Sequence, residues 1–155
     1  DRWEIGQIKI VHSSDEAASK ADIVISATTS LEPTFSGTCL KEGVFVAAVG
    51  ANIAEAREVD STAISRMDKL VIDSRDESLK NCGDLMVPLQ EQKIPLTSIV
   101  ELSELVNGTI RGRENAHQLT YYKSIGLPIQ DLAMAQAIET KAIAANIGTV
   151  IEMGG

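Results

Sequence analysis

Three short segments carry side chains that could bind a small ligand, and each directly follows an apolar run. They are residues 28–30 (TTS), 50–52 (GAN) and 123–126 (KSIG). Hydroxyl and amide side chains donate and accept hydrogen bonds, and a glycine lets a ligand approach the backbone closely. If the apolar runs are parallel strands, the segments meet at the carboxyl edge of the sheet, where open sheets bind ligands. The small hydroxyl residues at 28–30 would let a flat or phosphorylated ligand approach the backbone there.

Each segment also has a purely structural interpretation. The hydroxyls of residues 28–30 can satisfy loop amides, which is the favoured interpretation for that segment taken alone. Asn52 can occupy a left-handed turn, and residues 123–126 can form an ordinary strand-to-helix turn. The residues by themselves leave both interpretations open for these last two segments.

Other chemistries lack their signatures. The chain has no H-x-x-x-H, C-x-x-C or G-x-S-x-G pattern, so the common zinc and hydrolase sites are excluded and no metal site is expected. His12 and His117 share no motif with a carboxylate or a nucleophile. Cys39 and Cys82 are predicted to be free thiols in a reducing compartment.

Short apolar runs alternate with segments of helical character, and together they must position the three segments. The predicted strands are residues 8–11, 22–27, 44–49, 70–72 and 119–124. The run at 22–27 is nearly continuous, which is typical of a strand covered on both faces. Strands separated by helices favour parallel pairing and an α/β layered sheet.

Capping residues place the helices. Ser13 with Glu16, and Ser74 with Glu77, form capping-box patterns that open helices at about 14–21 and after residue 74. Asp60 is expected to cap residues 61–66, and Ser103 a helix that ends at residues 107–108.

The longest predicted helix covers about residues 129–147. Pro128 suits its first position and Gly148 the position after its end. Its apolar residues lie on one helical face: Ile129, Leu132, Ala133, Ala137, Ile138 and Ala142.

Composition restricts the partners. The 155 residues include 14 Lys and Arg against 22 Asp and Glu, a net charge of −8. This balance argues against binding to nucleic acid phosphates or to an anionic membrane. No apolar run approaches the length of a membrane span and no signal peptide is evident, so a soluble, cytoplasmic protein is expected.

Four blocks in one order resemble the ornithine cyclodeaminase/mu-crystallin family. They are ADIVISATTSLEP, VFVAAVGAN followed by REVD, ELSELVNG, and YKSIGLPIQDLA. The resemblance runs from about Ala21 to the end of the long helix. It implies a Rossmann-like three-layer α/β fold with a mainly parallel sheet, and an NAD or NADP cofactor. Members include ornithine cyclodeaminase, archaeal alanine dehydrogenase and ketimine reductase, so the implied substrate is an amino acid or a cyclic imine.

The resemblance also assigns candidate site residues. The implied cofactor-binding residues are Thr28, Val49, Gly50, Ala51, Asn52 and Ser124, and Ile125 would face the substrate. Asn52 is the candidate catalytic residue, because it stands where the cyclodeaminases carry an aspartate. An amide is no general base at neutral pH, so imine reduction fits this position better than cyclodeamination. Ala56 replaces an expected basic residue, whose role the adjacent Arg57 could take.

No G-x-G-x-x-G turn occurs in these residues, so the sheet is entered partway through. The resemblance places the glycine-rich turn, the first strand and the substrate-binding lysine and arginine upstream of the match. Residues 1–155 are thus expected to be a partial NAD(P)-binding domain, inactive alone, which fits a fragment, a truncated gene product or one half of a split protein. The alternative is a non-enzymatic, self-associating or partner-binding domain. In both cases an exposed sheet edge favours a homo-oligomer.

Overall fold

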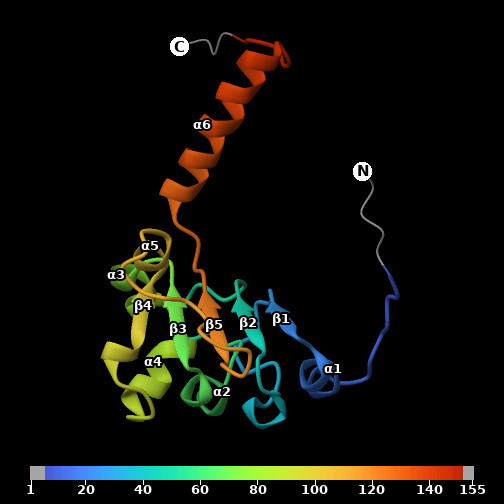
Figure 1. Ribbon diagram of the computed structural model, residues 1–155, viewed down its shortest axis with the longest axis vertical. Coiled ribbons are helices and arrows are strands. Elements are labelled where there is room, and N and C mark those ends of the chain that lie inside the picture. Colours follow the sequence, from blue (N-terminus) through green and yellow to red (C-terminus); the bar gives the residue numbers. More distant parts are fainter. Residues whose placement is uncertain (1–5, 152–155) are drawn as a thin grey trace. The chain divides into compact units, whose positions relative to one another are not determined.

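The computed structural model of the chain describes residues 6–151 (Figure 1). These residues fall into two units that divide after Ile125, and each unit is described by itself. The first unit holds a sheet with its covering helices. The second holds the long helix α6 (Pro128–Ala145). No helix within the described residues is both long and apolar enough to cross a membrane.

The first unit is built on a parallel five-stranded sheet. Its strands are β1 (Ile23–Ser26), β2 (Phe45–Ala48), β3 (Lys69–Ile72), β4 (Ile99–Glu101) and β5 (Thr120–Lys123). Their order across the sheet is β1-β2-β5-β3-β4, and every neighbouring pair is parallel. All five carboxyl ends therefore lie at one edge, which confirms the predicted Rossmann-like α/β fold.

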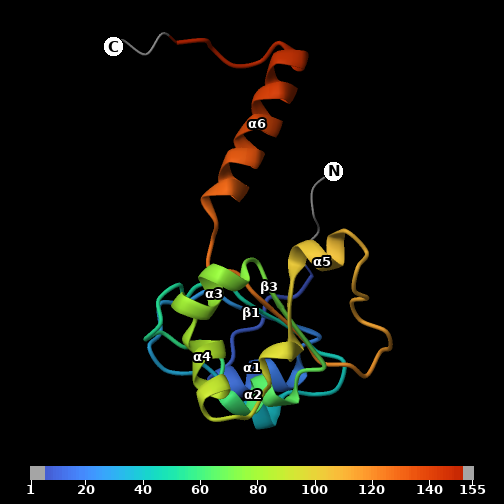
Figure 2. The ribbon, with the colours of Figure 1, turned by 90° about the vertical axis from the view of Figure 1, so that its left-hand side faces the viewer.

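Short helices connect the strands and cover the sheet. They are α1 (Ser14–Lys20), α2 (Ser61–Arg66), α3 (Arg75–Asn81), α4 (Gly83–Gln90) and α5 (Leu102–Val106), with 3-10 turns η1 (Gly37–Cys39) and η2 (Leu96–Ser98). Figure 2 shows α3 and α4 on one side of the sheet and α5 on the other. The buried core lies on the side of α2 and α4, where Ile64 and Leu85 have no exposed surface.

The strand register aligns side chains in rows on that buried face. One row joins Val46, Tyr121 and Leu70, all within the core. The next row, at the carboxyl end of the sheet, contains Ser26, Ala48, Lys123 and Ile72. Since side chains alternate between faces along a strand, the polar members of this row also point toward the helices.

Two of the predicted helix caps are confirmed. The Ser13 hydroxyl accepts a hydrogen bond from the Glu16 amide at 3.1 Å. Asp60 Oδ1 accepts one from the Ala63 amide at 2.6 Å, at the start of the helix predicted for residues 61–66.

One other predicted cap is right in position only, and one is wrong. Ser74 is the residue before α3, as predicted, but its side chain makes no capping hydrogen bond, and Asp73 accepts the Ser74 amide at 2.9 Å in place of the Glu77 of the predicted capping box. Ser103 lies inside α5, where Glu101 is the cap and forms a capping box with Glu104. Glu101 also accepts the Arg75 amide at 2.7 Å, so one carboxylate binds a free amide at the start of both helices.

The amino-terminal strand predictions need correction. Residues 8–11 form no strand, because no strand among the described residues pairs with them, and Ile8 and Ile10 are 81% and 90% exposed. β1 is also not covered on both faces. Ile23 and Ile25 are 61% and 69% exposed, and β1 is an edge strand within the described sheet.

Helix α6 begins at Pro128, as predicted, and runs to Ala145. Its end differs from the prediction, since Asn146 at φ 53° takes the left-handed position after the helix and Gly148 lies two residues beyond it. The predicted apolar face is exposed, with Ile129 at 64% and Ile138 at 59%. None of the residues of α6 is buried.

Candidate functional site

The carboxyl edge of the sheet brings the three ligand-binding candidates side by side. β1, β2 and β5 are consecutive in the sheet, so the segments that follow them are neighbours. The Val49 amide donates to the Ser26 carbonyl at 2.8 Å, and the Ser124 amide donates to the Ala48 carbonyl at 3.2 Å. The ends of three strands that are about 20 and 70 residues apart in sequence thus lie side by side.

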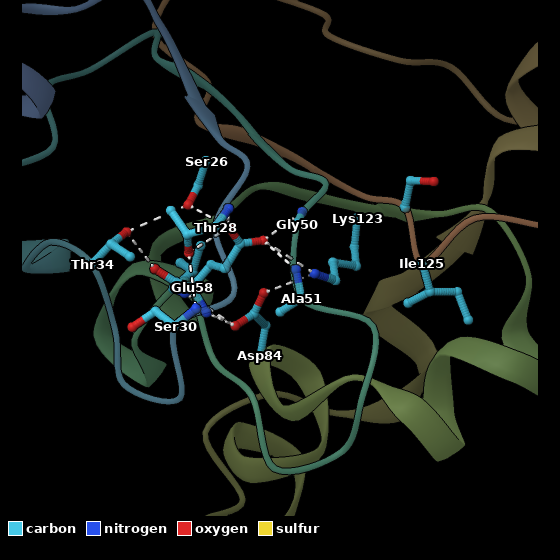
Figure 3. Close-up of polar contacts among 12 residues, drawn as sticks. Ser26, Thr28, Ser30, Thr34, Gly50, Ala51, Glu58, Asp84, Lys123 and Ile125 are labelled. Carbon is cyan, nitrogen blue, oxygen red and sulfur yellow. Dashed lines mark hydrogen bonds and ion pairs between the residues drawn. The ribbon is translucent and has the colours of Figure 1, made fainter.

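A buried carboxylate, Glu58, joins the first two segments (Figure 3). Its Oε1 accepts hydrogen bonds from the Ser26 hydroxyl at 2.7 Å, the Thr28 amide at 2.6 Å and the Thr28 hydroxyl at 3.0 Å. Its Oε2 accepts the amides of Gly50 at 2.8 Å and Ala51 at 2.9 Å. One side chain therefore binds the backbone of the segment after β1 and of the segment after β2.

These donors determine the ionisation of Glu58. Burial alone raises its pKa, but the amides of Ala51, Thr28 and Gly50 and the Ser26 hydroxyl outweigh burial and lower the pKa from 4.5 to about 2. Hydrogen bonds to the charged form favour that form. Glu58 is therefore a carboxylate throughout the physiological range.

Gly50 makes this arrangement sterically possible. A Cβ atom built on Gly50 would lie 2.2 Å from both the nitrogen and the oxygen of Thr28. Only hydrogen fits in that space, so the glycine is needed for the contact between the two segments.

Beneath the first two segments, Glu58 belongs to a buried charged cluster. Lys123 Nζ lies 3.5 Å from Glu58 Oε2 and 3.5 Å from Asp84 Oδ2, and all three side chains have no exposed surface. Asp84 Oδ1 accepts the Glu58 amide at 2.7 Å, and its Oδ2 accepts the Tyr121 hydroxyl at 3.0 Å. The pKa of Tyr121 is raised by burial and by Asp84, which keeps its hydroxyl protonated as the donor.

A second carboxylate holds the segment after β5. Asp73, directly after β3, accepts the Ser124 hydroxyl and the Ile125 amide, each at 3.0 Å, through Oδ2. Its Oδ1 accepts the Ser78 hydroxyl at 3.0 Å. The two residues predicted to face the nicotinamide and the substrate are therefore fixed in place through the end of β3.

The predicted site residues differ in what they can offer a ligand. Thr28, Val49 and Asn52 are exposed at the carboxyl edge, and Ser124 and Ile125 are half-buried. Ala51 is 4% exposed and its amide already binds Glu58, so it acts through packing.

Arg57 does not take the place of the basic residue absent at Ala56. Its guanidinium donates to the Ser61 hydroxyl at 3.0 Å, on α2, and Ala56 is 3% exposed. The charge of Arg57 is therefore directed toward α2 and not toward the residues at the carboxyl edge.

An open apolar groove of about 320 Å³ adjoins this edge. It runs along β1, and its lining includes Ala18, Ile23, Ile25, Thr28 and Phe35. Thr28 thus lies both at the carboxyl edge and in the groove.

The described residues contain neither a cluster of metal-ligand side chains nor a disulfide. No group of three or more His, Cys, Asp or Glu side chains within residues 6–151 is arranged to hold a metal ion. Cys39 and Cys82 are free, as predicted.

Sequence reasoning missed Glu58, Asp73 and Asp84. Glu58 stands in REVD, a block that the resemblance used without giving it a role. Asp84 follows a glycine within an apolar helix, and a carboxylate in such surroundings is a signal of a buried polar network. The role of Lys123 was also missed, although the two-residue period of β5 places it on the same face as the buried Tyr121.

Comparison with known proteins agrees with this arrangement. The model of the ornithine cyclodeaminase/mu-crystallin family matches residues 2–146. Delta(1)-pyrroline-2-carboxylate reductase of Bacillus thuringiensis subsp. konkukian (strain 97-27) is 36% identical over 151 residues, which cover 96% of this chain and 46% of the reductase.

Two solved structures have the same fold. The Delta(1)-pyrroline-2-carboxylate reductase of Thermococcus litoralis, in complex with NADH and L-proline, matches with a TM-score of 0.84 and 39% identity, covering 91% of this chain and 44% of the reductase. An archaeal alanine dehydrogenase dimer with bound NAD matches with a TM-score of 0.80 and 25% identity, covering 94% and 45%. The chain thus spans a little under half the length of these relatives.

Proposed function

The chain belongs to the ornithine cyclodeaminase/mu-crystallin family, and from this premise we propose that residues 1–155 form the nicotinamide-side part of an NAD(P)-binding domain in an imine-reducing enzyme. The proposed substrate is a cyclic imino acid of the Δ1-pyrroline-2-carboxylate class. The observation that carries the proposal is that the chain after β5 lies beside the end of β2 at the carboxyl edge, where the Ser124 amide donates to the Ala48 carbonyl.

The described residues fit one end of a nicotinamide cofactor. The edge offers the exposed residue Thr28, an apolar surface at Val49, which is 44% exposed, and an exposed amide at Asn52. A flat ring needs an apolar surface with a few polar groups at its rim, and these three residues supply both. The pyrophosphate-binding turn is not encoded in these residues, so they would hold only the nicotinamide end.

A bound reduced nicotinamide would supply the hydride, and the residues of this chain would position it. Val49 would support one face of the ring, and Asn52 and Ser124 would orient it. Ile125 would contact the substrate, and its backbone is fixed by Asp73. Asn52 would transfer no proton, because its side chain is an amide, so the imine nitrogen would take its proton from water as the hydride adds to carbon.

This assignment favours reduction over cyclodeamination. A cyclodeaminase needs a proton acceptor beside the substrate, and Asn52 cannot be one at neutral pH. The similarity to two Delta(1)-pyrroline-2-carboxylate reductases supports the same choice.

The proposal is tested by titrating the pure chain into NADH and NADPH while the fluorescence of the nicotinamide is followed. We expect saturable binding with a dissociation constant on the order of a millimolar, weak because the pyrophosphate contacts are missing. We expect no turnover of Δ1-pyrroline-2-carboxylate, proline, ornithine or alanine. Absence of binding at millimolar concentration would contradict the cofactor site, and turnover would contradict inactivity of the chain alone.

A second candidate function, self-association, is favoured by the exposed edge of β1. Ile23 and Ile25 are more than half exposed beside the apolar groove, and an unpaired strand edge is a template for another chain. In this alternative the chain is an interaction domain derived from the family, with no cofactor affinity.

A further inference from the structure

We propose that Glu58 is the positioning residue of the candidate cofactor site, because its carboxylate fixes the spacing between the segment after β1 and the segment after β2. The effect of Glu58 on cofactor binding rests on the proposed function. The hydrogen bonds of its carboxylate do not depend on any ligand. Thr28, Val49 and Asn52 are exposed in these segments, whereas Glu58 itself has no exposed surface. Glu58 therefore acts through the backbone and touches no ligand.

The division of donors between the two carboxylate oxygens supports this role. Among the described residues, Oε1 accepts hydrogen bonds from Ser26 and Thr28, at and after the end of β1, and Oε2 accepts them from the amides of Gly50 and Ala51, after β2. The two oxygens of one carboxylate are held at a fixed separation by covalent geometry. The distance between the two segments is thus determined by that group.

The surroundings of Glu58 keep the carboxylate in one place. Asp84 binds the backbone amides of Glu58 at 2.7 Å and Val59 at 3.0 Å, which fixes where the side chain starts. Lys123 lies 3.5 Å from Oε2 and balances part of the buried charge. In the row of side chains that faces the cluster, Ala48 lies between Ser26 and Lys123, so no larger side chain separates these two residues in the row.

Amide hydrogen exchange tests the proposal in three variants of the full chain. E58Q keeps the shape but places an amide NH₂ against backbone donors. E58D keeps the charge beside Lys123 but is one methylene too short to reach both segments. Y121F is the matched control, because it removes a buried hydrogen bond to Asp84 Oδ2 and touches neither segment.

We expect the amides of Thr28, Gly50 and Ala51 to exchange about tenfold faster or more in E58Q and E58D, while the strand amides of Val46 and Leu70 change little. Y121F should accelerate exchange at the three segment amides by no larger a factor than at the strand amides. If E58Q does not fold, E58D tests the proposal through the same comparison of segment amides with strand amides. Unchanged exchange at the three amides would overturn the proposal. Equal acceleration at all amides would also overturn it, because it would reveal only a loss of global stability.

NADH titration of the same variants supplies the functional readout. We expect E58D to bind NADH about tenfold more weakly than the unaltered chain, and Y121F to bind within about twofold of it. Equal affinity for all three proteins would overturn the positioning role. Failure of the unaltered chain to bind NADH would count against the proposed function alone, since the exchange data decide the geometry separately.

Discussion

At the scale of single residues, Glu58 joins stability and site geometry in one carboxylate. It accepts five hydrogen bonds, three through Oε1 and two through Oε2. A buried carboxylate is costly unless its lone pairs are used, and here the backbone supplies most of the donors. The free energy that holds the candidate site together is therefore also part of the free energy of folding.

The pKa of Glu58 predicts how stability depends on pH. The pKa is lowered from 4.5 to about 2 in the folded chain, so the charged form stabilises the fold above pH 4.5 and the contribution is lost as the pH falls toward 2. The full loss amounts to about 3 kcal/mol. Urea unfolding followed by circular dichroism between pH 7 and pH 2 measures it.

Two variants control this experiment. E58Q should be less stable at pH 7 and should lose most of the dependence below pH 5. E139Q, which alters an exposed carboxylate on α6, should keep the profile of the unaltered chain. A profile for E58Q parallel to that of the unaltered chain would assign the acid sensitivity to another group.

Gly50 gives a steric prediction at the same scale. In G50A the new methyl group would collide with backbone atoms of Thr28, which no side-chain rotation can relieve. We expect a loss of about 1–3 kcal/mol in the free energy of unfolding, with weaker NADH binding. G6A is the control, because nothing lies within 4 Å of its Cβ position. Equal unfolding free energies for G50A and G6A would show that the two segments are not in close contact.

At the scale of elements, most of the fold could be predicted because the signals are local. The strands at 44–49, 70–72 and 119–124 were visible as apolar runs, and Asp60 and Pro128 marked helix starts within a residue. The predictions that were wrong concern features that depend on contacts with another segment or residue. Residues 8–11 have the composition of a strand but no strand partner within the described part of the chain. Ser74 stands at the predicted cap position, but Asp73 accepts its amide in place of Glu77, so the capping box does not form.

The candidate site was predicted only in part, for the same physical reason. The segments 28–30, 50–52 and 123–126 could be located because parallel strands end at one edge. Glu58 could not be given its role, because its partners are mostly backbone amides as far as 30 residues away. Backbone donors leave no residue type in the sequence to identify them.

Asp60 and Ser74, two of the predicted helix caps, should differ in how much they contribute to the free energy of unfolding. D60A removes a side chain that accepts the Ala63 amide at 2.6 Å and the Gly37 amide at 3.0 Å. We expect it to cost about 1–2 kcal/mol. S74A removes a hydroxyl that makes no capping hydrogen bond, and we expect a change within about 0.5 kcal/mol. The opposite order of costs in urea unfolding would contradict the cap assignments.

At the scale of the whole molecule, β1 is the strand with its edge unpaired at one side of the described sheet. The apolar groove beside it is lined by α1 and by Phe35, so an added strand would find both backbone partners and an apolar surface. If self-association occurs, this edge is where we expect it.

Sedimentation velocity tests that expectation. The chain should form dimers or larger oligomers at micromolar concentration, and the double substitution I23K with I25K should make it monomeric, because lysine on a strand edge opposes pairing. I129K with I138K on α6 should leave the association intact. A monomeric unaltered chain, or association abolished only by the α6 substitutions, would contradict the assignment to β1.

The most direct test of the account is a heteronuclear NMR titration of the ¹⁵N-labelled chain with reduced nicotinamide mononucleotide, and with adenosine monophosphate as the control. We predict that the nicotinamide nucleotide shifts the amide signals of Thr28, Val49, Asn52, Ser124 and Ile125, and that the adenine nucleotide leaves them in place. Signal shifts confined to other parts of the sheet would show that this edge does not receive the nicotinamide ring. The absence of any shift at the highest soluble concentration of the nicotinamide nucleotide would show the same.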